Sequence, residues 1–257
     1  MSVDPAAAAL RRPRLYRFAS PVTFFALAGR LAPWFGVAAG GLALAALYIG
    51  FFVAPTDAQQ GEAYRIIFIH VPAAWMAMFL YLVMAFWSGC GLAFNARMPF
   101  MLAAAIAPTG AMMAALALWT GALWGRPMWG AYWVWDARLT STLILLFLYL
   151  GFLSLHAAID EPRRADRACA VLALVGAINV PIIYFSVKWW NTLHQGATIS
   201  MVKSPSIARP MLVAMLLMSL AFWMYSIATA LVRARTIVLE RERDSGWVRQ
   251  RFAAGVR

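Results

Sequence analysis

Residues 66–96 read IIFIHVPAAWMAMFLYLVMAFWSGCGLAFNA, a run of 31 residues without a charged side chain between Arg65 and Arg97. A helix needs about 20 predominantly apolar residues to cross the hydrocarbon core of a bilayer. This stretch is therefore long enough to span a membrane as one helix. Further uncharged runs of similar length lie on either side of it. Together with them, this stretch indicates a membrane protein with several spanning helices.

Five other uncharged runs contain 20 to 28 residues each. Each of them is also long enough to cross a bilayer. We predict an all-α, polytopic integral membrane protein in which residues 1–257 form a single six-helix membrane domain. The six transmembrane helices are expected at about residues 34–54, 66–94, 100–124, 139–159, 168–187 and 208–232.

The composition excludes most soluble classes of protein. Hydrophobic residues make up 63% of the chain and charged residues 12%, whereas ordinary globular domains have about 45–50% and 25%. So few charges cannot cover a soluble surface, which excludes an ordinary cytosolic enzyme, a disordered chain and a disulfide scaffold. In a soluble protein the net charge of +12 would suggest a nucleic-acid partner. Beside membrane helices the same charges report topology, so we expect membrane lipid and no nucleic acid.

The positive charges are divided unequally between the two sides of the predicted membrane domain. Six crossings place both termini on one side, and that side holds 16 Lys and Arg residues against six on the other. The positive-inside rule then places both termini in the cytoplasm, with residues 233–257 as a basic cytoplasmic tail. The longer loops, at about residues 55–65, 125–138 and 188–207, face outward. Residues 15–30 mix Arg with Phe and Leu, which favours an interfacial helix.

The second outward loop and the residue before it are rich in aromatic side chains. Four Trp and one Tyr occur between Trp124 and Trp135, with one Arg near each end of the loop. One or two Trp would indicate an interfacial belt, but this density indicates a flat aromatic surface edged by cations. Such a surface suits a large planar anion such as haem, because aromatic faces meet the ring and Arg pairs with the propionates. The candidate binding residues are Trp124, Arg126, Trp129, Tyr132, Trp133, Trp135, Asp136 and Arg138.

Arg138 is the stronger of the two candidates for a propionate, since it lies at the start of the predicted fourth helix. The alternative for Arg138 is a surface ion pair with Asp136, two residues away. Such an exposed pair contributes only about 0–1 kcal/mol to stability.

Two of the three histidines lie on the same side as the aromatic loop. His70 is near the outward end of the second predicted helix, and His194 lies in the third outward loop after Trp189 and Trp190. A lone His near an interface more often packs through hydrogen bonds. Two imidazoles beside an aromatic platform can complete six-coordinate haem iron, so we predict His70 and His194 as axial ligands. Trp189 and Trp190 are further candidate contacts, and His156, at the inward end of the fourth helix, is expected to be structural.

The chain contains no motif of a hydrolase, a nucleotide-binding site or a zinc site. Cys90 and Cys169 fall near inward helix ends and are expected to be packing residues rather than halves of a disulfide. Asn179 lies at depth in the fifth helix, where it is expected to bond to a neighbouring helix. Pro108 and Pro181 lie inside the third and fifth helices. Each removes a backbone donor and is expected to kink its helix, and we interpret both as packing residues.

Three segments together resemble the cytochrome c maturation protein C family, also called haem exporter protein C. The segment 129–141, WGAYWVWDARLTS, resembles the tryptophan-rich "WWD" signature of haem-handling proteins. The segments 189–196, WWNTLHQG, and 67–75, IFIHVPAAW, match the family equally closely, and they occur in the expected order. The resemblance covers about residues 35–235. Tyr132 stands where the family often has Trp, which keeps an aromatic face.

The resemblance implies a function beyond what the residues alone indicate. Such proteins lie in the bacterial inner membrane and hold haem b on the periplasmic face through two axial histidines, which match His70 and His194. They present haem for covalent loading onto a periplasmic haem chaperone. Their partners are an ABC-type ATPase with its membrane subunit and a small one-helix accessory protein. The chain is accordingly expected to be a haem-presenting platform and not an enzyme.

Two other function classes remain open at the level of the sequence. A bis-His b-type cytochrome would also use histidines in apolar surroundings, but it would bury the haem between helices, whereas these histidines lie at the outward rim. A ligand-free membrane subunit of a transporter would leave the Trp-rich loop as an interfacial belt. Rapid turnover of a quinone would identify the first class, and a purified protein without a haem spectrum would identify the second.

Overall fold

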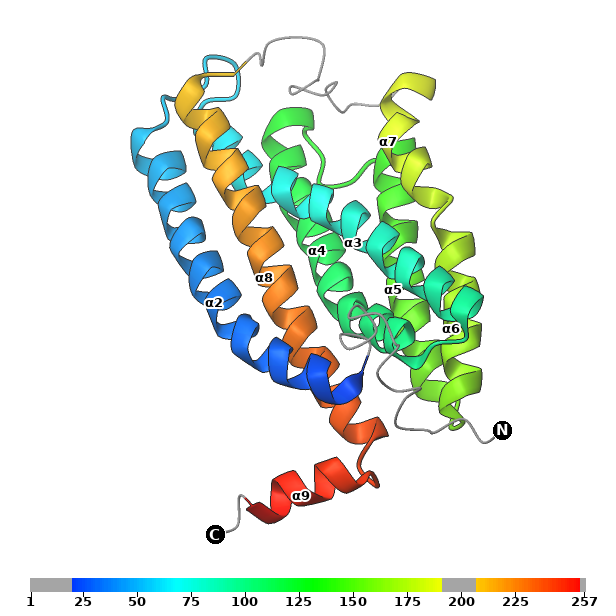
Figure 1. Ribbon diagram of the computed structural model, residues 1–257. Coiled ribbons are helices and arrows are strands. Elements are labelled where there is room, and N and C mark those ends of the chain that lie inside the picture. Colours follow the sequence, from blue (N-terminus) through cyan, green and yellow to red (C-terminus); the bar gives the residue numbers. More distant parts are fainter. Residues whose placement is uncertain (1–19, 191–206, 255–257) are drawn as a thin grey trace, which may run out of the picture.

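The computed structural model describes residues 20–190 and 207–254, and helices account for nearly all of this part of the chain (Figure 1). The described residues form no strand beyond an isolated bridge between Asp57 and Gly61. Within them, six helical segments are long and apolar enough to cross a membrane, which confirms the predicted fold class. These segments are Pro21–Val53, Glu62–Phe94, Arg97–Trp129, Ala137–Ala158, Pro162–Trp189 and Arg209–Arg241.

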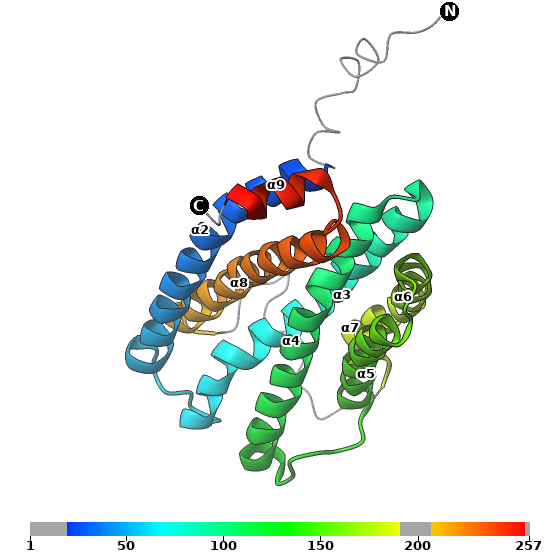
Figure 2. The same cartoon turned by 90° about the horizontal axis from the view of Figure 1, so that it is seen from below.

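The helices form three layers. One outer layer is a pair of helices, α2 and α8, and the central layer is the pair α3 and α4. The other outer layer contains α5 with α6 and α7, and the view from below shows α3 and α4 between the two outer layers (Figure 2). The helix bounds are Pro21–Tyr48 for α2, Ile67–Phe94 for α3, Arg97–Trp129 for α4, Ala137–Ala158 for α5, Pro162–Gly176 for α6, Asn179–Trp189 for α7 and Arg209–Arg241 for α8.

The bundle has two distinct ends. We call one end the rim; it is formed by the start of α3, the end of α4, the start of α5 and the end of α7 (Figure 1). The other end, the terminal end, holds the start of α2, the end of α8 and the short helix α9 (Gly246–Ala254). The aromatic loop and His70 therefore belong to the same end of the molecule, as the sequence predicts.

The first helix begins earlier than expected. Pro21 starts α2, and the helix continues through Pro33, so the described part of the expected interfacial segment, residues 21–30, belongs to the first long helix. For those residues the expected helix is the beginning of α2 and not an element of its own. This part of α2 packs at the terminal end. The Phe25 ring lies 5.7 Å from the Trp247 ring of α9, and the Arg235 guanidinium of α8 lies 4.3 Å from the centroid of the Phe25 ring.

The fifth crossing is interrupted where the proline predicts it. Helix α6 ends at Gly176 and α7 begins at Asn179. Pro181 has no N–H for the carbonyl four residues before it, which is that of Ala177. That carbonyl instead accepts from the N–H of Val180 over 3.1 Å. Asn179 donates from Nδ2 to the carbonyl oxygen of Ser141 on α5 over 2.8 Å, so its predicted interhelical bond is confirmed.

Two tyrosines join the central layer to α5 and α6. Tyr149 of α5 is fully buried and donates its hydroxyl to the carbonyl oxygen of Ala77 on α3 over 2.8 Å. Its ring fills the space above Gly110 of α4, where an added Cβ would lie 2.2 Å from the ring. Tyr81 packs edge-on against Tyr149 at 4.9 Å and occupies the corresponding space beside Gly176. Glycine is therefore required at both positions for the layers to approach this closely.

A buried ion pair holds three helices together at the terminal end. Arg241 of α8 donates to both carboxylate oxygens of Asp166 on α6, over 2.5 and 2.7 Å. His156 of α5 lies beside the pair, with Nε2 3.2 Å from Arg241 and 3.5 Å from Asp166. His156 therefore has a structural role at the end of the bundle opposite the rim, as expected. Cys90 and Cys169 are both free thiols, which agrees with the packing role predicted for them.

Candidate functional site

The start of α3, which carries His70, is tied to the end of the preceding helical segment. The Tyr64 hydroxyl donates to the Pro55 carbonyl over 2.7 Å, and Arg65 donates from Nη1 to the Gly50 carbonyl over 2.5 Å. The 3-10 turn Glu62–Ile66 then leads directly into α3. These contacts place His70 within the first turn of α3, at the rim.

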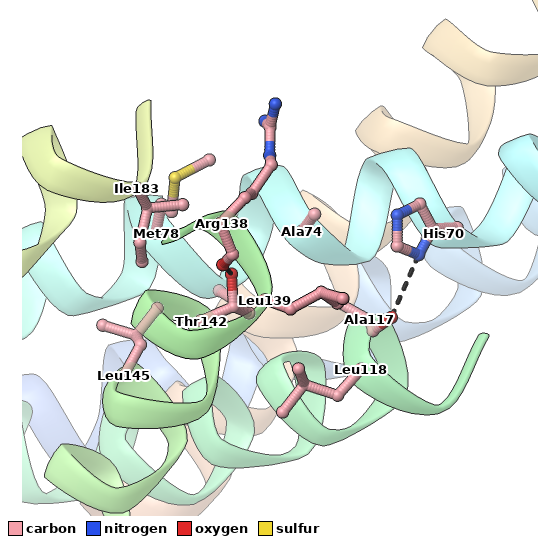
Figure 3. Close-up of a pocket in the computed structure, with 11 residues that line it drawn as sticks. His70, Ala74, Met78, Ala117, Leu118, Arg138, Leu139, Thr142, Leu145 and Ile183 are labelled. Atoms are coloured by element: carbon pink, nitrogen blue, oxygen red, sulfur yellow. Dashed lines mark hydrogen bonds between the residues drawn. The ribbon is translucent and has the colours of Figure 1, made fainter. Parts of the chain in front are cut away.

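The imidazole of His70 packs against one turn of α4. Its Nδ1 atom lies 3.0 Å from the Ala117 carbonyl oxygen and 3.1 Å from Thr120 Oγ1. A carbonyl oxygen only accepts, so Nδ1 carries the proton and donates it. In a neutral imidazole the lone pair is then on Nε2. In Figure 3 this second nitrogen is on the side of the ring that faces Ala74 and Arg138.

A small pocket at the rim lies between His70 and Arg138. It has a volume of about 40 Å³ and is bounded by four helices, with Ala77 and Met78 from α3, Leu118 from α4 and Ile183 from α7. Figure 3 shows His70 and Arg138 on opposite sides of it, and the Arg138 side chain extends away from Leu145. The pocket is therefore lined by His70 from α3 and by Arg138 from α5, and the Arg138 guanidinium is at the end of the side chain that points away from Leu145 (Figure 3).

The aromatic loop is shorter than predicted, because α4 continues to Trp129. Trp124 and Arg126 lie on the last turns of that helix, and only residues 130–136 form the connection to α5. Gly130 ends the helix in the left-handed conformation, with φ of +77°, and donates its N–H to the Arg126 carbonyl over 3.1 Å. Pro127 does not end the helix, although it removes one donor.

Arg126 contacts residues of the aromatic loop, and it does not line the pocket. Its Nη1 atom donates to the Gly130 carbonyl, and its guanidinium lies 5.8 Å from the centre of the Tyr132 ring. The structure therefore separates the two candidate cations: Arg138 belongs to the pocket, and Arg126 holds the loop.

Asp136 caps the helix that begins directly after it. Its Oδ1 atom accepts from the backbone N–H of Leu139 over 2.7 Å, which is the N-cap interaction expected of Asp. This bond sets the direction in which α5 leaves the loop. It therefore places Arg138, in the first turn of α5, at the pocket.

The loop aromatics form a surface at the rim. Trp135 is 78% exposed and Tyr132 is 60% exposed. Trp133 meets Trp135 edge-on at 5.4 Å, and Trp124 meets Trp129 at 5.7 Å. The indole nitrogen of Trp133 is buried and has no hydrogen-bond acceptor among the residues that the structure describes. A donor in that position has its hydrogen-bonding capacity unused within the described chain.

The end of α7 adds two further aromatic side chains to the rim. Trp189 stacks on Phe185 with ring centres 5.1 Å apart, and Trp190 meets Trp189 edge-on at 5.8 Å. Both Trp side chains are exposed. His194, the second predicted axial ligand, lies four residues after Trp190 and outside the residues that the structure describes.

Sequence reasoning missed several residues that shape the site. Thr120 and Gly121 of α4 contact the His70 ring, and Gln60 accepts from the Trp124 indole nitrogen over 3.2 Å. No motif marks these positions, because each depends on how two helices are aligned with each other. The spacing of Thr120, four residues before Trp124, is the one local signal, since it places both side chains on the same face of the helix.

Comparisons with known proteins agree with the resemblance. The family model described as "Heme exporter protein C" matches residues 14–249. Heme exporter protein C of Bradyrhizobium diazoefficiens is 48% identical over 227 residues, which cover 88% of this chain and 86% of that protein. The protein of the same name from Escherichia coli K12 is 42% identical over 235 residues, covering 91% and 94%.

A more distant organism has a similar protein. A ccmC-like mitochondrial protein of Marchantia polymorpha, named for cytochrome c biosynthesis, is 44% identical over 194 residues, which cover 76% of this chain and 82% of that protein. The family match extends over most of the chain and includes all six candidate spans and the rim. The chain belongs to the heme exporter protein C family.

Proposed function

We propose that the chain binds haem b at the rim and presents it for covalent loading onto a periplasmic haem chaperone during cytochrome c maturation. The observation that carries this proposal is the orientation of His70. Its Nδ1 lies 3.0 Å from the Ala117 carbonyl oxygen and donates to it, so Nε2 would be the nitrogen that binds the iron. The names of the relatives, which are heme exporter proteins, support the same ligand.

The side chains around the pocket fit the chemical parts of haem. His70 would supply one axial nitrogen, and His194 would supply the other. Arg138, across the pocket from His70, would pair with a propionate. The exposed faces of Trp135 and Tyr132 would meet the macrocycle or a docking protein. When bound, haem supplies the iron and the vinyl groups that react, while this chain binds and orients it.

The size of the pocket favours presentation over burial. The cavity of about 40 Å³ at the rim is small, whereas pockets that enclose a ligand typically have about 300–1,000 Å³. A b-type cytochrome that insulates its haem would need a much larger cavity between the helices. Aromatic side chains that are exposed at the rim instead suit a ligand that a second protein must reach. The chain is therefore a binding platform, and any ATP hydrolysis belongs to a partner ABC-type ATPase.

The proposal includes an orientation and a set of partners. The rim faces the periplasm of a bacterial inner membrane, and both termini lie in the cytoplasm, on the 16-to-6 division of the positive charges. The partners are the ATPase with its membrane subunit, a small one-helix accessory protein and the haem chaperone. A reporter that is active only in the periplasm, fused after Arg257, should be silent. Strong reporter activity would reverse the orientation and move the rim to the cytoplasm.

Purified protein tests the proposed function against its alternatives. The protein isolated from membranes should carry haem with a b-type spectrum, and the reduced haem should be oxidised slowly by an added quinone. Rapid quinone turnover would identify an electron-transfer cytochrome instead. A preparation that neither contains haem nor binds added haem would identify a ligand-free membrane subunit.

A further inference from the structure

One turn of α4, from Ala117 to Gly121, forms a receiving surface for the His70 ring. The turn provides two oxygen atoms to Nδ1, the Ala117 carbonyl at 3.0 Å and Thr120 Oγ1 at 3.1 Å. It also provides space, because Gly121 has no side chain next to the ring. A Cβ at Gly121 would lie 3.0 Å from His70 Cε1, which is tighter than nine in ten real Cβ contacts.

The direction of the hydrogen bonds follows from the partners of Thr120. Its hydroxyl proton is directed to the Leu116 carbonyl, because Oγ1 lies 2.6 Å from that oxygen. The Thr120 oxygen therefore accepts from His70 Nδ1–H and does not donate to it. The Ala117 carbonyl and Thr120 Oγ1 are then both acceptors for Nδ1–H, and the same tautomer satisfies these two contacts. The Thr120 side chain is buried, so water does not compete for this bond.

We propose that Thr120 is a positioning residue for His70. The Ala117 carbonyl sets the Nδ1–H tautomer, and Thr120 adds a second acceptor that holds the ring at a set angle, with Nε2 directed to the pocket. The inference rests on the proposed function, in which His70 is an axial ligand of haem iron. A ligating histidine whose second nitrogen donates to an acceptor is a stronger base at the metal. Thr120 therefore strengthens the His70–iron bond and stabilises ferric over ferrous haem.

The first test needs no haem. The chain has three histidines, so the full-length protein labelled with ¹⁵N-histidine gives three imidazole pairs, assigned with His156→Gln and His194→Gln variants. His70 should show a protonated Nδ1 and an unprotonated Nε2. Thr120→Val, which keeps the shape and removes the oxygen, should move the Nδ1 resonance, and Thr120→Ser should restore it. An unprotonated Nδ1 at His70 in the parent protein would overturn the proposal.

The second test uses the haem-loaded protein. Thr120→Val should raise the midpoint potential of the haem and weaken haem retention by about tenfold. Removing the hydrogen-bond acceptor of a ligating histidine typically weakens metal affinity by about 10- to 100-fold, and this is the lower end of that range. Thr120→Ser should behave as the parent. Thr109→Val is the matched control, because Thr109 is also a buried threonine of α4 but bonds to Thr229 Oγ1 at 3.1 Å, far from His70 along the helix. It should leave potential and retention unchanged.

The outcomes separate this inference from the proposed function. Equal potentials and equal haem retention in the Thr120→Val and Thr120→Ser proteins would overturn the positioning role even if His70 ligates iron. Equal shifts in Thr120→Val and Thr109→Val would also overturn it, since the effect would then be a general response of α4. An unchanged haem spectrum in His70→Ala would overturn the ligand assignment itself, and with it the effect of Thr120 on the iron.

Discussion

The rings of His70 and Trp124 lie 6.2 Å apart, with an angle of 39° between their planes. One ring belongs to the first turn of α3 and the other to the last turns of α4, and the Trp124 indole nitrogen donates to Gln60. The candidate iron ligand and the beginning of the aromatic surface are therefore neighbours, although they are separated by more than 50 residues in the chain. A substitution of either ring should therefore alter the position of the other.

Adding one methyl group beside His70 should release the haem. Gly121→Ala places a Cβ at 3.0 Å from His70 Cε1, so the ring must move by a few tenths of an ångström, which should disturb its contacts with the Ala117 carbonyl and Thr120 Oγ1. We expect haem retention to fall about 10-fold or more, measured as the ratio of Soret to protein absorbance after purification. Gly40→Ala is the control, since a Cβ there meets nothing within 4 Å. Equal retention in the two variants would contradict the close packing of His70.

The aromatic loop should matter more for transfer than for stability. Trp135 is 78% exposed, so its removal costs little packing. Replacing Trp129, Trp133 and Trp135 together by Ala should leave the protein in the membrane at a near-normal level and abolish covalent loading of the haem chaperone. A haem stain of the chaperone, beside an immunoblot of this chain, measures both. Trp119→Ala, at an exposed position within α4, should affect neither. Normal chaperone loading without the three Trp would refute the platform.

The two arginines of the rim should differ in their effect. Arg138 lines the pocket opposite His70, whereas Arg126 bonds to the Gly130 carbonyl. Arg138→Lys should weaken haem retention, because Lys cannot form the planar two-point contact with a carboxylate. Arg126→Lys keeps a donor for the carbonyl and should retain more haem. A larger loss in Arg126→Lys than in Arg138→Lys would show that the propionate contact is assigned to the wrong arginine.

The ion pair at the terminal end should stabilise the fold, and its removal should leave haem binding unaffected. The Asp166 side chain is 4% exposed and makes two bonds to Arg241. Asp166→Asn leaves the guanidinium without its charge partner, and breaking a buried pair in this way costs about 3–5 kcal/mol. Denaturant unfolding in detergent should report that loss, with the haem spectrum unchanged. Asp244→Asn, in an exposed ion pair, should cost less than about 1 kcal/mol. Similar losses in the two variants would show that burial of the pair is unimportant.

The number of spans was predictable because it depends on local composition alone. Each uncharged run is long enough to cross a bilayer, and the structure has a helix over each of them. Helix ends were less predictable, because they depend on contacts with other segments. Helix α2 begins at Pro21, before the expected start at residue 34, and its Phe25 packs against Trp247. Helix α4 ends at Trp129, five residues after the expected limit at Trp124.

The candidate residues of the site follow from residue types, and their arrangement in space does not. The sequence indicates His70, Arg138 and a dense aromatic loop, and the structure brings His70 and Arg138 to one pocket. The sequence does not indicate Thr120 or the pairing of Asp166 with Arg241, because both depend on how helices that are distant in the chain are aligned. Such contacts leave no local pattern, and a buried Thr or a charged helix end has many ordinary explanations.

The most direct test of the central claim is the coordination of the iron. Electron paramagnetic resonance and visible spectra of the ferric haem protein should be compared between the parent and the variants His70→Ala, His194→Ala and His156→Ala. Two axial imidazoles should give a low-spin signal in the parent and in His156→Ala. Either rim substitution should convert the signal to high spin or remove the haem. An unchanged low-spin signal in both His70→Ala and His194→Ala would contradict the assignment of the iron to the rim histidines.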